Sequence, residues 1–312
     1  MNTHINNIKV SVVLPIYNGE KTLAATLKSL EDQTFKDFEV VACIDGTQDG
    51  SQTILNSYKE IFKNLIILYN EENLGLGPTM NRLVANASGV YIAIAEQDDY
   101  YYPQRLQLQV ELLDAKSDIG LVSGIAEFWD GEKVTSKFPG LLVSGKHYPE
   151  GKELFLLNYR NQIKVVNSCI MFRKSVHIDN GLYFTKHYPS ISVDWTYILR
   201  FSLVSKIYGL QETLVRLDRR VERTSVTSNK KKQFAATREL IRSFAYEYPE
   251  IVSKKDYRYA LTSQQLLELS SLGGFSFLVR IIFNYLNNPT DARWLTYMNK
   301  RLKRFFKKMI PL

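Results

Sequence analysis

Residues 10–18 have the sequence VSVVLPIYN, a run of apolar and β-branched residues that ends in two polar ones. Such a short apolar run is typical of a buried strand, and Ile8 to Ile16 is the first strand that we expect. An amphipathic stretch from Glu20 to Asp32 follows, and then a second apolar run from Phe38 to Ile44. This order predicts a parallel βαβ unit, because the crossover between two parallel strands has to be covered by a helix.

The same alternation continues along the chain and predicts an α/β fold with a mixed, mostly parallel sheet flanked by helices. We expect further helices at 49–62, 78–86, 103–116 and 194–204, and further strands at 65–68, 91–95, 121–128 and 168–172. After Asn229 the pattern is wholly helical. We therefore expect a catalytic domain over 1–229, with halves at about 8–118 and 119–229, and a basic helical C-terminal extension over 230–312.

The composition is that of an ordinary globular protein, with 45% apolar and 23% charged residues in 312. Cys43 and Cys169 are far apart and have no ligand-type spacing, so we expect two core thiols in a reducing compartment. The polar N-terminus does not resemble a secretory signal. The best candidate for a membrane span, Leu272 to Leu286, is short and contains Arg280. We expect a cytoplasmic protein that does not span the membrane.

The positive charge is concentrated in one part of the chain. Residues 230–312 hold 16 Lys and Arg and 6 Asp and Glu, a balance of +10, whereas residues 1–229 have a balance of −2. Near the end, four apolar residues at helical spacing lie among basic ones, a pattern typical of helices on an anionic membrane surface. A helix packed on the body of the protein is the alternative. The four residues are Leu302, Phe305, Phe306 and Met309.

Polar residues follow three of the expected strands, at the edge where open α/β sheets bind ligands. Pro15, Tyr17 and Asn18 end the first strand, and Asp45 follows the second. Tyr17 offers a flat face for a base, and Asp45 offers an acceptor for a base or ribose donor. Carboxylates follow a later strand and would repel a bare diphosphate, but they suit Mg²⁺ or Mn²⁺, which bridges phosphate oxygens. These carboxylates are Glu96, Asp98 and Asp99.

Four motifs in order resemble the family-2 glycosyltransferases with the GT-A (nucleotide-diphospho-sugar transferase) fold, over about residues 8–225. Residues 10–18 resemble the opening strand of that family, and residues 45–51, DGTQDGS, resemble its Asp-Asp-Gly-Ser loop. Asn73 to Gly75, with Asn81 soon after, resembles the next loop. Residues 96–99, EQDD, followed by Pro103 and Arg105, resemble its Asp-x-Asp region.

The resemblance implies roles for individual residues. Asp98 would bind Mn²⁺ or Mg²⁺ with help from Glu96, and Asp194 would be the catalytic base of an inverting displacement. The expected donor is a nucleotide diphosphate sugar, with UDP first, and the acceptor is a saccharide or lipid-linked saccharide in surface polysaccharide synthesis. The implied donor-binding residues are Pro15, Tyr17, Asn18, Asp45, Gly75, Asn81 and Asp99.

The chain departs from the family pattern at three positions, since Ile44, Met80 and Val221 stand where an acid, an Arg and a His are common. Arg219 or Arg220 is an alternative partner for phosphate.

Less specific interpretations stay open at this point. Asp98, Asp99 and Asp194 could be helix caps, and Tyr17 could be a packing residue. An inactive relative that binds a sugar nucleotide is the alternative function. A nucleic-acid-binding protein is disfavoured, because the body is slightly acidic and no recognition module appears.

Overall fold

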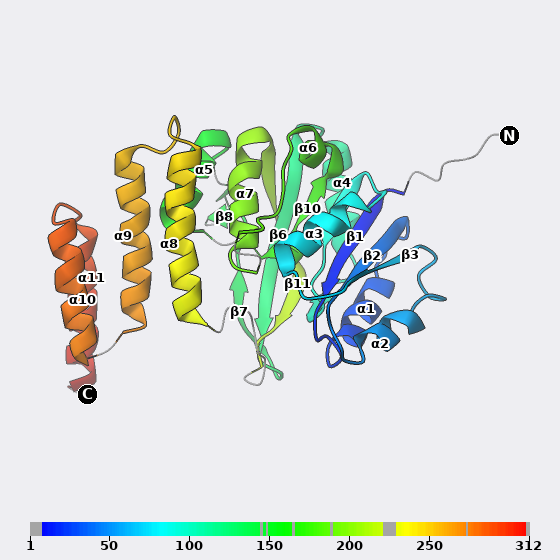
Figure 1. Cartoon of the computed structure of the whole chain (residues 1–312), viewed down its shortest axis with the longest axis horizontal. Coiled ribbons are helices and arrows are strands. Elements are labelled where there is room, and N and C mark those ends of the chain that lie inside the picture. Colours follow the sequence, from blue (N-terminus) through cyan, green and yellow to red (C-terminus); the bar gives the residue numbers. More distant parts are fainter. Residues whose placement is uncertain are drawn as a thin grey trace. The chain divides into compact units, whose positions relative to one another are not determined.

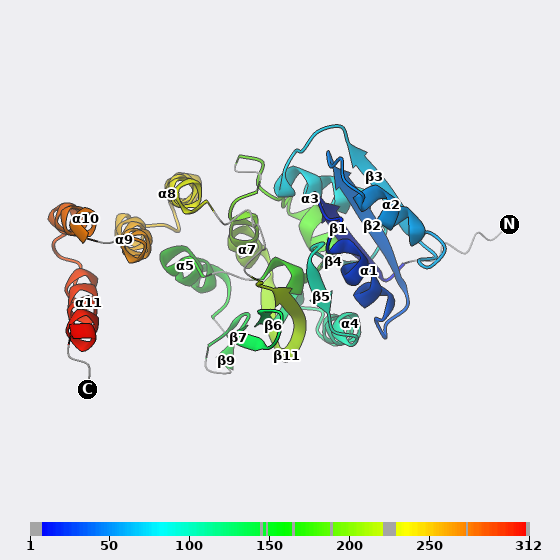
Figure 2. The same ribbon diagram turned by 90° about the horizontal axis from the view of Figure 1, so that it is seen from below.

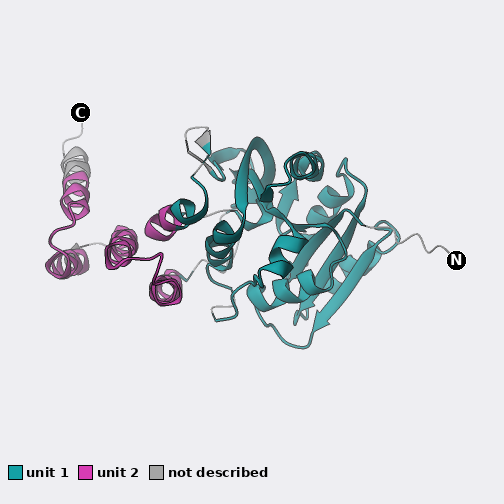
Figure 3. Cartoon of the chain, turned by 90° about the horizontal axis from the view of Figure 1, so that it is seen from above, with its two compact units in different colours: residues 1–155, 163–229 teal, residues 156–162, 230–312 magenta. Residues whose placement is uncertain are grey.

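The computed structural model describes residues 8–143, 146–147, 149–163, 166–187, 190–220, 229–272 and 274–309. The chain forms two compact units, coloured separately in Figure 3. The first contains residues 1–155 and 163–229, and the second contains residues 156–162 and 230–312. The second unit thus includes a short segment, 156–162, that the sequence pattern did not assign to it.

One mixed sheet forms the centre of the first unit (Figure 1), with the parallel order β3, β2, β1, β4 in its first half. These strands are β1 (Val10–Ile16), β2 (Phe38–Asp45), β3 (Leu65–Asn70) and β4 (Tyr91–Ile94). The sheet continues with β10 (Met171–Arg173), which is antiparallel to β4 and to β6 (Ile119–Trp129). Next come β11 (Lys206–Asp218), parallel to β6, and β5 (Asp99–Tyr101), antiparallel to β11. Finally, β7 (Val134–Phe138) pairs with β6, and β8 (Leu142–Val143) pairs with β9 (Lys146–His147) in a separate ribbon.

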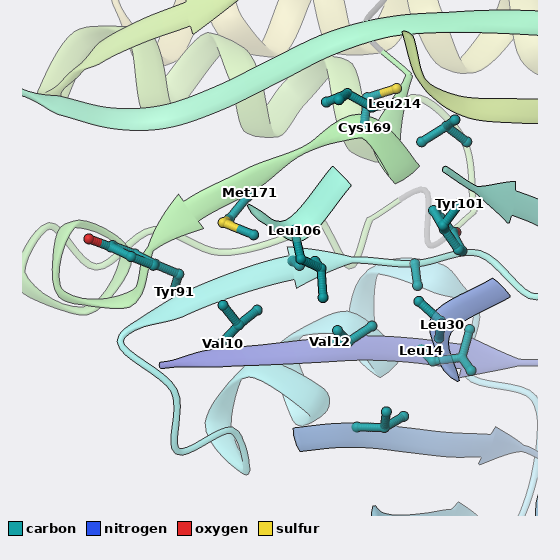
Figure 4. Packing of buried hydrophobic residues seen from close by; sticks show 14 of the residues in the cluster. Val10, Val12, Leu14, Leu30, Tyr91, Tyr101, Leu106, Cys169, Met171 and Leu214 are labelled. Atoms are coloured by element: carbon teal, nitrogen blue, oxygen red, sulfur yellow. The ribbon is translucent and has the colours of Figure 1, made fainter. Parts of the chain in front are cut away.

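Helices cover both faces of this sheet (Figure 2), because alternate strand residues point to opposite sides. Val10, Val12 and Leu14 pack in one core (Figure 4), whereas Val13 packs in the other. The first core lies under α1 (Leu23–Glu31), α2 (Ser51–Ser57) and α4 (Arg105–Ala115). The second lies under α3 (Leu76–Ala85) and α7 (Val193–Val204). The remaining short elements are α5 (Gly151–Asn161), η1 (Asn167–Cys169) and α6 (Lys174–Asp179).

The expected α/β class with a mixed sheet is confirmed. The sequence pattern missed β11, α5 and several short elements, and it overextended the helix at 49–62, which ends at Ser57. The expected strand at 168–172 is also wrong at its start, because Ser168 and Cys169 belong to η1 and β10 begins at Met171. Strand β11 escaped detection because its register against β6 shifts between Gly209 and Thr213, where polar residues interrupt the alternation. Both thiols are free and buried as expected, and burial raises the pKa of Cys43 to about 11 and of Cys169 to about 12.

The topology collects several strand ends at one edge of the sheet. Strands β1, β2 and β4 are parallel, and β6 and β11 run in the same direction because β10 is antiparallel to both β4 and β6. Helix α7 ends at Val204, directly before β11 begins at Lys206. The start of α7 therefore lies at the edge where these strands end, which is the edge of the acidic residues after β4.

The second unit consists of helices and has its own small core. Its helices are α8 (Lys230–Glu247), α9 (Lys254–Ser270), α10 (Gly274–Asn287) and α11 (Arg293–Met309), with the last residues of α5. Leu269, Ile281 and Trp294 join α9, α10 and α11. The Arg301 guanidinium donates to the carbonyls of Leu269 (3.0 Å) and Leu272 (2.6 Å), which closes the C-terminal end of α9.

Among the described helices, none has the length and apolar character needed to cross a bilayer. The side chains of Leu302, Phe305, Phe306 and Met309, which carry the predicted apolar stripe of the tail, lie outside the described part of the structure.

Candidate active site

Three carboxylates gather directly after β4, where the strand order reverses from β1 to β4. Oxygen atoms of Glu96, Asp98 and Asp99 all lie within 4.8 Å of one another. Glu96 and Asp98 are half-buried, and Asp99 is only 2% exposed. Helix α4 begins at Arg105, so neither Asp98 nor Asp99 caps it, and the helix-cap interpretation of this pair is wrong. A cluster of hard oxygen ligands at a strand end suits a divalent cation of the Mg²⁺ or Mn²⁺ type.

Buried residues beneath this acidic loop hold its backbone. The Glu96 amide donates to the Tyr101 hydroxyl (2.6 Å), and that hydroxyl donates to the Glu96 carbonyl (3.1 Å). The Thr26 hydroxyl lies 2.8 Å from the Gln97 carbonyl. Arg105 is fully buried, stacks on the Tyr101 ring at 4.5 Å, and donates to the carbonyl of Ile94 (2.7 Å). Burial lowers the pKa of Arg105, while Tyr101, Cys169 and Asp99 oppose that shift. The loop therefore rests on buried hydrogen bonds, with the Arg105 guanidinium beneath it.

Two residues that the sequence analysis missed contact the carboxylates directly. The Ser168 hydroxyl donates to Asp99 Oδ2 at 2.5 Å, and the Asn167 amide donates to Glu96 Oε1 at 3.2 Å. Both belong to η1, and they are 0% and 5% exposed. Asn167 Oδ1 is buried and has no hydrogen-bond partner among the described residues. This oxygen belongs to a side chain that contacts Glu96 directly, and a buried oxygen of this kind is a further feature that fits a cation.

The loop after β1 is tied to the acidic loop. The Tyr17 amide donates to Gln97 Oε1 (2.8 Å), and Gln97 Nε2 donates to the Tyr17 carbonyl (2.7 Å). The Asn18 amide donates to the Thr47 hydroxyl at 2.9 Å, which joins the same loop to the end of β2. Tyr17 is 47% exposed, so it is not a core packing residue, and it is accessible to a base. Pro15 lies in β1 in register with Cys43 of β2.

Asp45 is 4% exposed and accepts three hydrogen bonds from the protein itself. Its Oδ1 accepts from Asn70 Nδ2 (2.6 Å) and the Leu74 amide (3.0 Å), and its Oδ2 accepts from the Gly75 amide (3.0 Å). Gly46 has a φ of +66°, and a Cβ there would lie 2.3 Å from the backbone of Asn73. Asp45 thus holds the loop at 73–75 in place, and Gly46 leaves the room that its close approach needs.

The other predicted donor residues lie around this loop. Gly75 has a φ of +86° and precedes α3, a backbone conformation that favours glycine. Asn81 exchanges two hydrogen bonds with the backbone of Phe184, both at 2.8 Å, and so holds the segment that leads to α7. Ile44 and Met80, which replace polar residues of the family pattern, are buried at 4% and 0% exposure. Both are core residues.

Asp194 lies in the first turn of α7, and its Oδ1 accepts from the Trp195 amide at 2.8 Å. The residue that precedes this helix is Ser192, in the left-handed conformation with a φ of +54°. The turn that carries Asp194 therefore begins with a strained backbone, a feature that clusters at functional sites. The start of α7 lies at the same sheet edge as the acidic loop.

Basic residues occupy the end of β11. Arg216 stacks between the rings of Tyr100 (4.6 Å) and Trp129 (4.8 Å), and Arg220 Nε pairs with Asp218 at 2.8 Å. Arg219 stacks over Phe128 at 5.0 Å. Val221, in the position of the family histidine, lies outside the described residues. These arginines bring positive charge near the strand β5 that starts at Asp99.

The same fold occurs in two solved glycosyltransferase structures. Staphylococcus aureus TarS 1–349 in complex with UDP-GlcNAc has a TM-score of 0.65 at 20% identity, covering 96% of this chain and 81% of that one. The mannosyltransferase PcManGT from Pyrobaculum calidifontis, in complex with GDP-Man and Mn²⁺, has a TM-score of 0.56 at 14% identity, covering 96% and 87%. The expected GT-A fold is therefore confirmed.

Curated relatives are glycosyltransferases. The putative glycosyltransferase EpsE of Bacillus subtilis is 29% identical over 56% of this chain and 66% of its own length. The UDP-Glc:alpha-D-GlcNAc-diphosphoundecaprenol beta-1,3-glucosyltransferase WfgD of Escherichia coli is 27% identical over 41% and 50%. The chain thus spans less than two thirds of the length of these relatives. The model of the family described as "Glycosyl transferase family 2" matches residues 11–181, more than half of the 312 residues, and the chain belongs to that family.

Proposed function

We propose that the protein is an inverting, metal-dependent glycosyltransferase that moves a sugar from a nucleotide diphosphate sugar to an acceptor hydroxyl in surface polysaccharide or glycan synthesis. One observation carries the proposal: Glu96, Asp98 and Asp99 converge within 4.8 Å at the end of β4 in a member of glycosyl transferase family 2. Three converging carboxylates are unfavourable for a diphosphate unless a cation lies between them and the phosphates.

Asp98 is the first metal ligand that we propose, with Glu96 and Asp99 beside it and Asn167 Oδ1 as a neutral oxygen at the same place. Mn²⁺ or Mg²⁺ fits this set of oxygen ligands. A bound ion would neutralise the charge that develops on the departing nucleotide diphosphate. Ser168 and Asn167 orient the carboxylates through the two hydrogen bonds that they donate.

The donor would bind along the ends of β1, β2 and β4. Tyr17 supplies the exposed ring for the base, with Pro15 and Asn18 in the same loop. Asp45 shapes the base pocket through the amides of Leu74 and Gly75 that it holds. Asn81 of α3 would support the same region, because it holds the backbone of Phe184 against that helix. UDP is the proposed nucleotide, supported by the UDP-GlcNAc complex of the structurally similar TarS.

Asp194 is the proposed catalytic base. Its carboxylate would take the proton of the acceptor hydroxyl while that oxygen forms a bond to C1 of the sugar, and the bond from C1 to the diphosphate oxygen breaks on the opposite face. A single displacement of this kind inverts the anomeric centre. We expect the base to contribute about 10²–10⁴-fold to the rate.

The proposed acceptor is a saccharide or a lipid-linked saccharide, in line with the diphosphoundecaprenol-linked acceptor after which WfgD is named. Such an acceptor would place the enzyme on the cytoplasmic face of the cell membrane, held peripherally by its basic C-terminal helices. The +10 balance of residues 230–312 supports attraction to an anionic surface.

The test is nucleotide release from a panel of UDP-, dTDP- and GDP-sugars with and without Mn²⁺. We expect release from one donor that depends on Mn²⁺, disappears in Asp98→Ala and persists in the control Asp118→Ala, whose side chain is 59% exposed and pairs with Lys206. Asp194→Ala should still bind the donor with metal but transfer the sugar at least about 100-fold more slowly. If no donor is hydrolysed and none binds in a metal-dependent way, the chain is an inactive relative instead.

A further inference from the structure

Helix α10 has an uncovered apolar side. Since each residue of a helix advances by about 100°, five of its apolar residues fall within an arc of about 140°. Each of the five is more than half exposed: Leu278 53%, Val279 52%, Ile282 58%, Phe283 57% and Leu286 70%. The opposite side of the helix packs in the core of the second unit through Ile281, which is 3% exposed. The helix is therefore apolar on both sides, and only one side is covered within the unit.

This pattern differs from that of the neighbouring helix in the same unit. In α9, the only large apolar side chain among the described exposed residues is Leu267, at 48%. A helix at a protein–water boundary normally carries polar residues on its outer face, and a contiguous apolar patch marks a place of interaction. The apolar face of α10, residues 278, 279, 282, 283 and 286, thus needs a partner.

The net charge of the segment that forms α10 and α11 favours an anionic partner. Residues 274–309 contain eight Lys and Arg and one acid, Asp291. That acid is paired with Arg293 through its Oδ1 at 2.9 Å. Two copies joined face to face would bring two such positive regions together, which is unfavourable. An anionic lipid surface offers both an apolar interior and opposite charge.

The edge of the apolar face is also suited to the headgroup region. Arg280 is exposed and lies about 60° around the helix beyond Phe283, with Ser276 and Asn287 between them. An arginine at such an edge can keep its aliphatic stem on apolar surface while its guanidinium reaches phosphates. Leu295 of α11, at 56% exposure, adds another exposed apolar side chain in the same unit.

We propose that α10 lies in the headgroup layer of an anionic membrane with its apolar face toward the acyl chains. With 14 residues the helix is about 21 Å long, too short to cross a hydrocarbon core of about 30 Å, so it lies in the plane of the surface. The inference deepens the peripheral location proposed above. It rests on the segment from Leu272 to Leu286, which from the sequence alone is only a stretch too short to span a membrane. The apolar face itself contains none of the residues at the end of α11.

The experiment is sedimentation of the full-length protein with vesicles of phosphatidylcholine alone or with one quarter phosphatidylglycerol. The test variant is Ile282→Ser with Phe283→Ser, and the matched control is Leu267→Ser on α9. We expect binding to the anionic vesicles and at least a tenfold weaker binding constant for the double variant, since it removes about two large apolar contacts with the bilayer. The control should bind like the natural protein, and all variants should keep their melting temperature, because the replaced side chains are exposed.

Three results would overturn the proposal. The first is no binding of the natural protein to anionic vesicles, and the second is equal binding of the double variant, which would assign the contact to the end of α11. The third is a lipid-free dimer that the double variant abolishes, which would make a second copy the partner. Vesicle binding is measured without donor or acceptor, so its outcome is separate from the outcome of the glycosyl-transfer test.

Discussion

Replacing Ser168 by alanine removes a hydroxyl that contacts the acidic loop directly. Ser168 is 0% exposed, and its hydroxyl donates to Asp99 Oδ2 at 2.5 Å. Asp99 is itself 2% exposed, so water cannot easily replace the lost donor. Hydrogen bonds to charged groups contribute about 1.5–3 kcal/mol each. We therefore expect Ser168→Ala to lower the free energy of unfolding by about that amount.

The same substitution should weaken metal binding, because the carboxylate of Asp99 loses the group that orients it. Residues that orient metal ligands typically change metal affinity by about 10–100-fold when they are replaced. The assay is a titration of Mn²⁺ in the presence of UDP, with free Mn²⁺ followed by electron paramagnetic resonance. Urea denaturation of the same samples gives the change in stability.

Ser123→Ala is the matched control for this prediction. Ser123 is also 0% exposed, but its hydroxyl has no hydrogen-bond partner in the part of the chain that the structure describes. Its removal should change stability by less than about 1 kcal/mol and leave Mn²⁺ affinity unchanged. The reasoning is refuted if Ser168→Ala binds Mn²⁺ with UDP as tightly as the natural protein does.

Three further predictions concern stability. Asp45→Ala leaves the amides of Leu74 and Gly75 without their acceptor and should cost about 3 kcal/mol in urea denaturation, and an unchanged midpoint would contradict the structural role of Asp45. Gly46→Ala forces a Cβ within 2.3 Å of backbone at a φ of +66° and should cost at least about 2 kcal/mol, so a stable variant would argue against this loop geometry. Burial lowers the pKa of His177 from 6.5 to about 4, so the unfolded chain binds its proton first as the pH falls. Stability should thus decrease by up to about 3 kcal/mol from pH 6.5 to 4, and His177→Gln should flatten that part of the pH profile.

The first half of the sheet and the acidic loop were predictable from sequence because their signals are local. Apolar runs of strand length alternate with amphipathic helices from residue 10 onward. This alternation predicts a parallel sheet whose faces are covered by the helices. Parallel strands end at a common edge, so the carboxylates after β4 had to lie near the loop after β1. The link between Tyr17 and Gln97 is the result.

The tertiary structure decided which distant residues complete the site. Asn167 and Ser168 follow the carboxylates by about 70 positions, and their contacts arise because β10 pairs antiparallel with β4. From the sequence we expected Asp45 to contact the nucleotide base, but its carboxylate accepts three hydrogen bonds from the protein itself, a set of contacts that no pattern around Asp45 reveals.

What the sequence determined by itself is the α/β class, the parallel character of the first half of the sheet and the acidic loop, because periodicity and turn residues act over a few neighbours. What only the tertiary structure decided is which side chains face one another across long separations in sequence. The face of α10 is the clearest case. Its apolar residues resemble core residues in the sequence, and only the packing of α9 and α11 on one side of α10 leaves the other side exposed.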